Sequence, residues 1–186
     1  MNIRCIIKLL ICLNKGKMDI MEIERKWLFD MKKVPVELSK TETYYTQSYL
    51  SINPEVRIRS KRVKNLETSE ISDITYKLCI KGEGTLVRHE IEKELSKSEY
   101  EELLEVGNID KDNVVTKTYY RIPVDEKHEF TVGTVDEGKD SQFSYGEIEF
   151  ESEEEARSFK SPEWFGQDVT EDKSYKMKNY WKRTRG

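Results

Sequence analysis

The stretch 21-MEIERKWL-28 decides the fold of this chain. Its charged residues Glu22, Glu24 and Lys26 alternate with residues 23, 25 and 27, and a period of two is typical of a β-strand. Successive residues on one strand face stand about 6.6 Å apart. The three charged side chains can therefore address one ligand from a single surface.

The same period of two returns along most of the chain and predicts seven further strands. They cover residues 42–52, 56–59, 73–81, 88–94, 114–124, 129–135 and 144–151. The turn residues Asn53-Pro54 and Gly82-Glu83-Gly84 separate neighbouring pairs, as in hairpins. We therefore expect a mainly β protein of α+β class in which hairpins dominate.

Helix-start signals add two or three helices. Capping-box patterns begin at Ser96 and Ser152 and predict helices that end at Gly107 and before residue 161. A third helix is predicted from about residue 170 to 183, because acidic residues open that segment and basic residues close it.

Composition indicates one folded and unusually charged domain. The 186 residues suit a single domain, since domains typically hold about 100 to 150 residues. Charged residues make up 37% of the chain, whereas about 25% is typical. The net charge of −4 provides no global attraction to nucleic acid or anionic membranes, so any site for a polyanion must be local. The sequence does not indicate an oligomeric state.

Residues 1–20 are expected to be an N-terminal extension, and residues 21–186 the domain. The apolar run at 5–13 is far shorter than the roughly 20 residues that a membrane helix needs. Met18 and Met21 both precede the first strand, so a misassigned start codon explains the extension; a secretion signal is the alternative, although no small-residue cleavage site follows. The three cysteines have no metal-ligand spacing, and their odd number favours a reducing, cytoplasmic compartment.

Several predicted strands carry charges on one face and apolar residues on the other. The simplest interpretation is the wet face of a half-buried antiparallel sheet. The alternative is a closed barrel whose charged faces line a lumen, where acids and bases must pair or hold ions. A triphosphate with a divalent metal fits such a lumen, because Lys and Arg bind phosphoryl oxygens and carboxylates bind a hard cation.

Six ordered segments resemble the CYTH domain, the triphosphate tunnel metalloenzyme superfamily. Residues 22–26 match its E-x-E-x-K signature. The other matching segments are Arg57-Ile58-Arg59, 80-IKGEG-84 with 88-RHEIE-92, 115-VTKT-118, 147-EIEF-150, and 164-WFGQDVT-170 with Lys173 and Tyr175. The resemblance spans residues 21 to about 180.

The resemblance implies a closed, eight-stranded antiparallel β-barrel with flanking helices, whose tunnel binds a triphosphate and Mg²⁺ or Mn²⁺. The implied metal ligands are carboxylates, namely Glu22, Glu24, Glu90, Glu92, Glu129, Glu147 and Glu149. The implied phosphate-binding residues are basic, namely Lys26, Arg57, Arg59, Lys81, Arg88, Lys117 and Arg121. Within these sets, Lys26, Glu24 and Arg59 are the predicted catalytic residues.

Two positions depart from the family pattern. Tyr119 stands where the family commonly has Arg, and Arg121 on the same strand face is the candidate to replace it. Thr131 stands where the family commonly has Asp, and Glu129 or Asp136 are the candidates to compensate. The number of metal ions, one or two, is left open by this loss.

The predicted function is metal-dependent hydrolysis of a small triphosphate, with inorganic tripolyphosphate preferred. Basic residues and metal would offset charge on the transferred phosphoryl group while water attacks in line. The alternatives are thiamine triphosphatase, class IV adenylyl cyclase, and a non-enzymatic CYTH protein that binds polyphosphate or nucleotides. No nucleic acid or membrane partner is expected.

Overall fold

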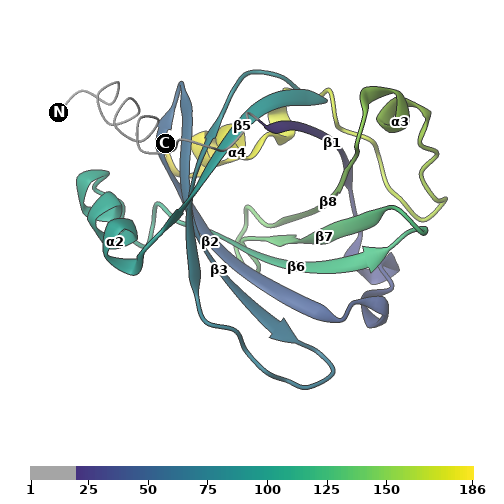
Figure 1. The fold of residues 1–186 in the computed structure, drawn as a ribbon, viewed down its shortest axis with the longest axis horizontal. Helices are drawn as coiled ribbons and strands as arrows, with labels where there is room; N and C mark the ends of the chain where they lie inside the picture. The colour runs from purple at the N-terminus through teal and green to yellow at the C-terminus, as the bar shows by residue number, and fades with distance from the viewer. Residues whose placement is uncertain (1–19) are drawn as a thin grey trace.

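Eight antiparallel strands close into a barrel in the computed structural model, which describes residues 20–186 (Figure 1). The strands are β1 (Ile20–Leu28), β2 (Thr41–Ile52), β3 (Glu55–Asn65), β4 (Thr75–Lys81), β5 (Val87–Leu95), β6 (Val115–Pro123), β7 (Glu129–Val135) and β8 (Phe143–Glu149). The predicted mainly β, eight-stranded closed barrel is confirmed. The predicted N-terminal extension lies outside the described residues, apart from Ile20.

The barrel order is β1-β5-β4-β3-β2-β6-β7-β8, and β1 closes it by pairing with β5 on one side and β8 on the other. Glu22 lies opposite Arg88 of β5, whereas Glu24 lies opposite Glu149 of β8. Strand β1 thus joins β5, from the middle of the chain, to β8, the last strand. The charged residues 22–26 therefore lie on the strand that closes the barrel.

Apolar side chains cover the outer face of the barrel. Trp27 is 1% exposed and packs with Phe130 and Phe165, and Ile148 of β8 lies in the same cluster. These strand residues alternate with charged neighbours, so packing their side chains outwards directs the charged ones inwards. The expected inversion, with an apolar outside and a charged inside, is therefore present.

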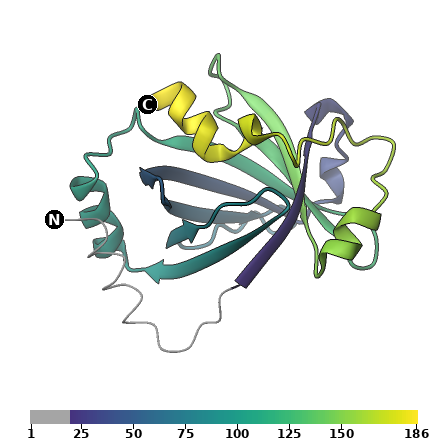
Figure 2. The ribbon, with the colours of Figure 1, turned by 90° about the horizontal axis from the view of Figure 1, so that it is seen from above.

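Two predicted helices are confirmed. Helix α2 (Lys97–Val106) begins with a capping box between Ser96 and Glu99 and ends at Gly107. Helix α3 (Glu153–Ser158) begins after Ser152, whose side chain accepts a hydrogen bond from the backbone of Glu155. Figure 2 shows α2 and α3 at opposite sides of the barrel.

The third predicted helix is partly wrong. A single 3₁₀ turn covers Lys173–Tyr175, and the α-helix, α4 (Met177–Arg185), begins only after it. Asp172 caps the 3₁₀ turn through the backbone of Ser174, and Lys176 is extended, so the chain cannot continue as one helix from residue 170.

Helix α4 packs on side chains from the inner face of the barrel. Met177 and Tyr180 join a cluster with Val115, Val135 and Tyr145, which project from β6, β7 and β8. These three strand residues share the face of the cavity-lining Lys117, Thr131 and Glu147. The helix therefore fills one end of the barrel. Among the helices of residues 20–186, none is both long and apolar enough to cross a membrane.

Candidate functional site: a charged tunnel

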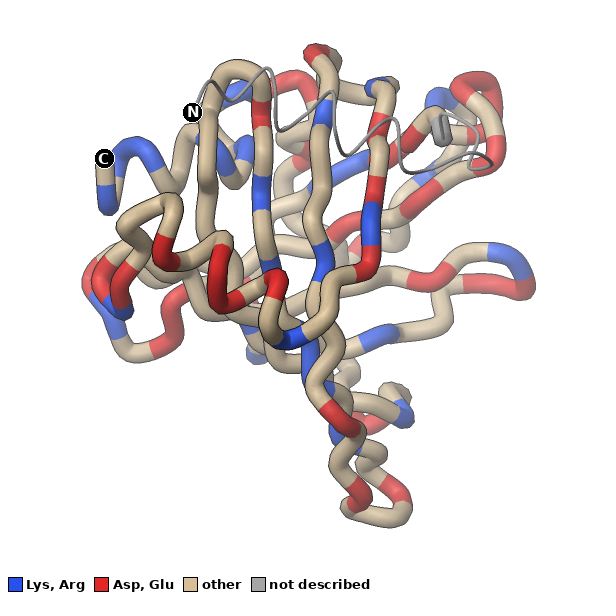
Figure 3. The backbone as a smooth tube through the Cα atoms, turned by 60° about the vertical axis from the view of Figure 1, so that its left-hand side comes forward, with Lys and Arg blue, Asp and Glu red and all other residues tan. Residues whose placement is uncertain are grey.

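The barrel encloses a cavity of about 720 Å³, within the range of about 300 to 1,000 Å³ for ligand sites. All the predicted site residues line it, namely Glu22, Glu24, Lys26, Arg57, Arg59, Lys81, Arg88, Glu90, Glu92, Lys117, Arg121, Glu129, Glu147 and Glu149. Figure 3 shows acidic and basic residues distributed along neighbouring strands. The placement of these residues agrees with the sequence prediction, and their roles stay predictions.

An ion-pair network joins β1, β4 and β5 across the tunnel wall. The Nζ of Lys81 lies 2.7 Å from Glu22 and 3.1 Å from Glu90. Arg88 donates to Glu22 at 2.6 Å and to Glu24 at 2.7 Å. These side chains are at most 14% exposed, so their charges interact in a less polar medium than water.

Further pairs lie around the same cavity. Lys26 lies 2.8 Å from Glu147, so it stands among the carboxylates of β8. Glu92 accepts from Arg59 at 2.8 Å. Arg121 and Glu129 form a 3.1 Å pair at the rim, where both side chains are about half exposed.

Two buried cations of the tunnel have no ion pair with any other described residue. Arg57 is 7% exposed and its Nε has no hydrogen-bond partner. Lys117 is also 7% exposed, and its Nζ donates to the hydroxyl of Tyr145 at 3.1 Å. Burial lowers the pKa of Lys117 well below its usual value, and the charge of Arg57 lowers it further. Buried positive charge without a counter-charge is costly, and a phosphate group is the complement that it lacks.

The carboxylates of β1 and β8 form the opposite kind of surface. Glu24 lies directly across from Glu149, and Glu147 lies across from Lys26. Loss of hydration raises the pKa of Glu149, and the nearby Glu22, Glu24 and Glu147 raise it further. Among the described residues Glu149 has no ion pair. Repelling carboxylates of this kind fit a divalent cation, because a hard cation takes oxygen ligands and removes the repulsion.

A second acidic cluster fits a hard cation less well. One ligand atom each from Cys79, Glu90 and Glu92 lies within 4.8 Å of the others. Burial raises the pKa of Cys79 to about 12, so the residue stays a thiol and donates to Glu90 at 2.7 Å. Lys81 and Arg59 pair with the two carboxylates, whereas Glu149 on the surface of β1 and β8 has no ion pair among the described residues. The thiol and the paired carboxylates make this cluster a poorer set of ligands for a hard cation than the surface of β1 and β8.

The two departures from the family pattern both face the tunnel. Tyr119 is 6% exposed and its hydroxyl donates to that of Tyr145. The residue opposite is Gly133, where a Cβ atom would overlap both the backbone carbonyl of Thr118 and the ring of Tyr119. Arg121 shares this face but lies at the exposed rim, some distance along the strand from the buried position of Tyr119. If Arg121 replaces the arginine that the family commonly has at position 119, it does so from the rim of the tunnel.

Thr131 lies between Arg121 and Glu147 in the strand register and lines the cavity. A residue that compensates for the missing carboxylate must line the cavity, and Glu129 does so. Asp136 does not. It is fully buried at the end of β7 and pairs with Arg185 at 2.6 Å, so the expectation that Asp136 compensates in the tunnel is wrong.

Sequence reasoning missed several polar residues of the wall. Gln47 lines the cavity at 2% exposure, and its Nε2 has no hydrogen-bond partner. Glu55 and Tyr145 line the same cavity. The alternation within residues 42–52 places Gln47 on one face with Tyr45 and Tyr49, but aromatic and amide residues on a strand face carry no charge signal that would identify a tunnel.

Comparisons with known proteins agree with this geometry. No protein-family model matches the chain. The inorganic triphosphatase of Nitrosomonas europaea is 32% identical over 165 residues, which cover 84% of this chain and 94% of that protein. A crystal structure described as that of an inorganic triphosphatase is 28% identical, with a TM-score of 0.52 over 86% of this chain and 96% of that chain. A second crystal structure of the same protein, described as hypothetical, is 27% identical, with a TM-score of 0.51 over 85% and 95% of the chains.

A closed barrel with acids and bases facing one lumen is the arrangement that the resemblance to triphosphate tunnel metalloenzymes implies. The chain belongs to the CYTH, or triphosphate tunnel metalloenzyme, superfamily, and its inorganic triphosphatase relative lies in the same family. The resemblance read from six sequence segments is confirmed.

Proposed function

We propose that this chain is a metal-dependent triphosphatase that hydrolyses inorganic tripolyphosphate to pyrophosphate and phosphate. The observation that carries the proposal is the presence in one tunnel of buried cations without counter-charges, Arg57 and Lys117, and of a carboxylate surface on β1 and β8. A polyanion would supply the counter-charge for Arg57 and Lys117, and a divalent cation would neutralise the carboxylate surface. The relationship to an inorganic triphosphatase supports the choice of substrate.

The basic residues would bind and orient the substrate. Arg57 and Arg59 project from adjacent inward positions of β3, and Lys117 projects from β6. Each can donate to phosphoryl oxygens, and a guanidinium can do so through two parallel hydrogen bonds. Held in this way, the chain of phosphates is fixed in line for attack on one phosphorus atom, with little reorganisation during the reaction.

The acidic residues would hold Mg²⁺ or Mn²⁺. Glu22, Glu24, Glu147 and Glu149 supply the oxygen ligands that these cations prefer. When bound, the cation polarises phosphoryl oxygens and makes water easier to deprotonate. Glu24 reaches both this surface and Arg88, and Lys26 is paired with Glu147, so these two residues connect the acidic and basic halves of the site.

A panel of substrates separates the related activities. The full chain is incubated with tripolyphosphate, thiamine triphosphate and ATP, each with Mg²⁺ or Mn²⁺, and products are identified by ³¹P NMR. We expect tripolyphosphate to give the highest kcat/KM. Preferred cleavage of thiamine triphosphate would favour a thiamine triphosphatase. Formation of pyrophosphate and cyclic AMP from ATP would favour a cyclase, and binding without turnover would favour the non-enzymatic alternative.

A matched pair of variants tests the assigned surface of β3. Arg59 lines the tunnel, whereas Arg62 on the same strand is exposed and does not line it. We expect Arg59→Ala to lower kcat/KM for tripolyphosphate by about 100-fold, as loss of one charge-stabilising donor does elsewhere. Arg62→Ala should change it by less than about twofold. Equal losses in the two variants would contradict the assignment.

A further inference from the structure

Helix α4 is tied to several separate segments at one end of the barrel. The Nζ of Lys178 lies 3.8 Å from Glu55 at the start of β3 and 3.0 Å from Glu83 in the turn between β4 and β5. The indole nitrogen of Trp181 donates to the carbonyl of Asn113 before β6 at 2.6 Å. The helix therefore spans this end of the barrel.

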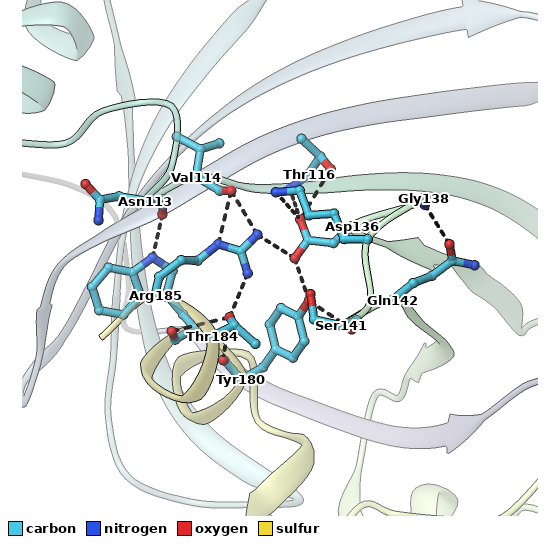
Figure 4. A network of polar contacts seen from close by, with 12 residues as sticks. Asn113, Val114, Thr116, Asp136, Gly138, Ser141, Gln142, Tyr180, Thr184 and Arg185 are labelled. Carbon is cyan, nitrogen blue, oxygen red and sulfur yellow. Dashed lines mark hydrogen bonds and ion pairs between the residues drawn. The ribbon is translucent and has the colours of Figure 1, made fainter.

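A buried ion pair fixes the carboxyl end of the helix. Arg185 donates to Asp136 at 2.6 Å and to the carbonyl of Val114, and its side chain is 5% exposed. Asp136 also accepts from the hydroxyl of Tyr180 and from the backbone of Thr116 (Figure 4). The whole arrangement lies outside the tunnel, and the proposed chemistry uses none of it.

The end of the tunnel beneath α4 changes from polar to apolar. Gln47, Arg57 and Tyr49 carry buried polar atoms without partners, and the ring of Tyr49, two residues beyond Gln47 on the same strand face, lies 5.6 Å from the ring of Trp181 of α4 at an angle of 56°. Next to these residues lies the cluster described above, in which Val115, Val135 and Met177 are apolar and the hydroxyl of Tyr145 accepts a hydrogen bond from Lys117. A phosphate chain that enters from the rim of Arg121 and Glu129 would therefore meet hydrogen-bond donors and then an apolar wall, and a charged group cannot advance into an apolar wall without a large desolvation cost.

We propose that α4, held by the Asp136–Arg185 pair, is a stop that sets which phosphoanhydride bond of a linear oligophosphate lies at the reacting position. The proposal rests on the proposed function of the same tunnel. Asp136 and Arg185 are positioning residues, because they act through the helix and do not touch the substrate. In the reaction, the oxygen of water bonds to one phosphorus and the bond from that phosphorus to the bridging oxygen breaks. The departing phosphate keeps the bridging oxygen with the electron pair, and the proton lost by water passes to that oxygen or to solvent.

Tripolyphosphate cannot report this register, because its two anhydride bonds are equivalent and both give phosphate and pyrophosphate. Linear tetraphosphate can. Cleavage of a terminal bond gives phosphate and tripolyphosphate, whereas cleavage of the central bond gives two pyrophosphates. A stop at a fixed distance from the reacting position admits one of these outcomes, since the fourth phosphate protrudes towards the open rim.

The experiment follows initial tetraphosphate products by ³¹P NMR in the full chain and in Arg185→Met, Asp136→Asn and Lys182→Ala. Lys182 lies on the same helix and is exposed, so Lys182→Ala is the matched control. Amide hydrogen exchange of residues 177–185 is measured in parallel. We expect one product pair in the wild type and in Lys182→Ala. In Arg185→Met and Asp136→Asn we expect both product pairs, formed at rates that differ by no more than about threefold. Amide exchange in α4 should be at least tenfold faster in these variants than in the wild type.

Each of the other outcomes contradicts a specific part of the proposal. A mixture of products in the wild type, or no tetraphosphate cleavage beside active tripolyphosphate cleavage, contradicts a stop with an open rim opposite. A single product pair in variants whose α4 exchanges rapidly contradicts the role of the helix, and unchanged exchange contradicts the role of the ion pair. Failure of the wild type to hydrolyse tripolyphosphate refutes the proposed function itself and is read from a separate assay. The wild-type register test needs no variant, so it stands even where a substitution prevents folding.

Discussion

Lys117 shows how a single residue can favour binding at the expense of stability. Its ammonium group is buried beside Arg57 without an ion pair, and its pKa is lowered. The unfolded chain therefore binds a proton more readily than the folded one. The resulting loss of stability is complete below the folded pKa of Lys117 and disappears as pH rises from there to the unfolded value of about 10.4.

We predict that Lys117→Met stabilises the ligand-free protein by about 1 to 3 kcal/mol at pH 7, as replacement of other buried charges by apolar residues does. The same variant should lose at least tenfold in kcat/KM, because a phosphate contact is removed. Urea unfolding and steady-state kinetics measure the two effects. A variant that is both less stable and fully active would contradict this account.

Glu149 carries the matching prediction for the acidic surface. Its raised pKa means that a cation must compete with a proton, so we expect the rise in melting temperature caused by Mg²⁺ or Mn²⁺ to be smaller at pH 5 than at pH 7.5. Glu149→Gln should reduce that rise at both pH values. Thermal unfolding with and without the cation tests this, and an unchanged rise in the variant at pH 7.5 would exclude Glu149 as a ligand.

At the scale of elements, β1 and α4 differ in how far sequence predicts them. Strand β1 follows from the alternation of residues 22–26, because a local period of two fixes which face each side chain takes. Helix α4 begins later than predicted, because the cap at Asp172 and the extended backbone of Lys176 interrupt the segment. The charge pattern that suggested the helix says where basic residues are favourable, and little about where the helix begins.

The contacts of α4 could not be predicted from the sequence either. Asp136 and Arg185 are 49 residues apart, and an acidic residue after a strand is equally compatible with a tunnel ligand. Only the closed barrel places the turn after β7 next to the end of the chain. Similarly, the unpartnered donors of Gln47 and Arg57 appear once eight strands share a lumen.

We predict that Arg185→Met destabilises the protein by about 3 to 5 kcal/mol at pH 7, because it leaves the carboxylate of Asp136 buried without its counter-charge. Lys182→Ala, on the exposed side of the helix, should change stability by less than about 0.5 kcal/mol. Equilibrium unfolding in urea measures both values. Equal stability of the two variants would show that the ion pair does not hold α4.

The pair also has a pH signature with a defined sign. Burial acts to raise the pKa of Asp136, but hydrogen bonds from Tyr180 and Thr116 and the charge of Arg185 outweigh it and lower the pKa. The stabilisation is therefore present above the unfolded pKa of about 3.9 and is lost as pH falls through the folded value. We predict that stability falls more steeply below pH 4 in the wild type than in Asp136→Asn, measured by urea unfolding across pH. Parallel curves would contradict this.

At the scale of the molecule, the barrel converts scattered charges into one site. Acids and bases from seven of the eight strands line a single cavity, although the net charge of the chain is only −4. The sequence predicted this convergence because alternation recurs along the chain and the six family segments occur in order. It could not predict that the buried Arg57 and Lys117 lack an ion pair while the buried Lys26 and Lys81 have one, since pairing depends on register between distant strands.

The central claim is that this charged tunnel hydrolyses a triphosphate only when a divalent cation occupies its acidic surface. The most direct measurement is phosphate release from tripolyphosphate by the full chain with Mg²⁺ or Mn²⁺, after removal of the cation by a chelator, and in Glu24→Gln. We predict hydrolysis with the cation, loss of at least about 100-fold without it, and a similar loss in Glu24→Gln while Arg62→Ala stays active. Full activity in the presence of the chelator, or in Glu24→Gln, would contradict it.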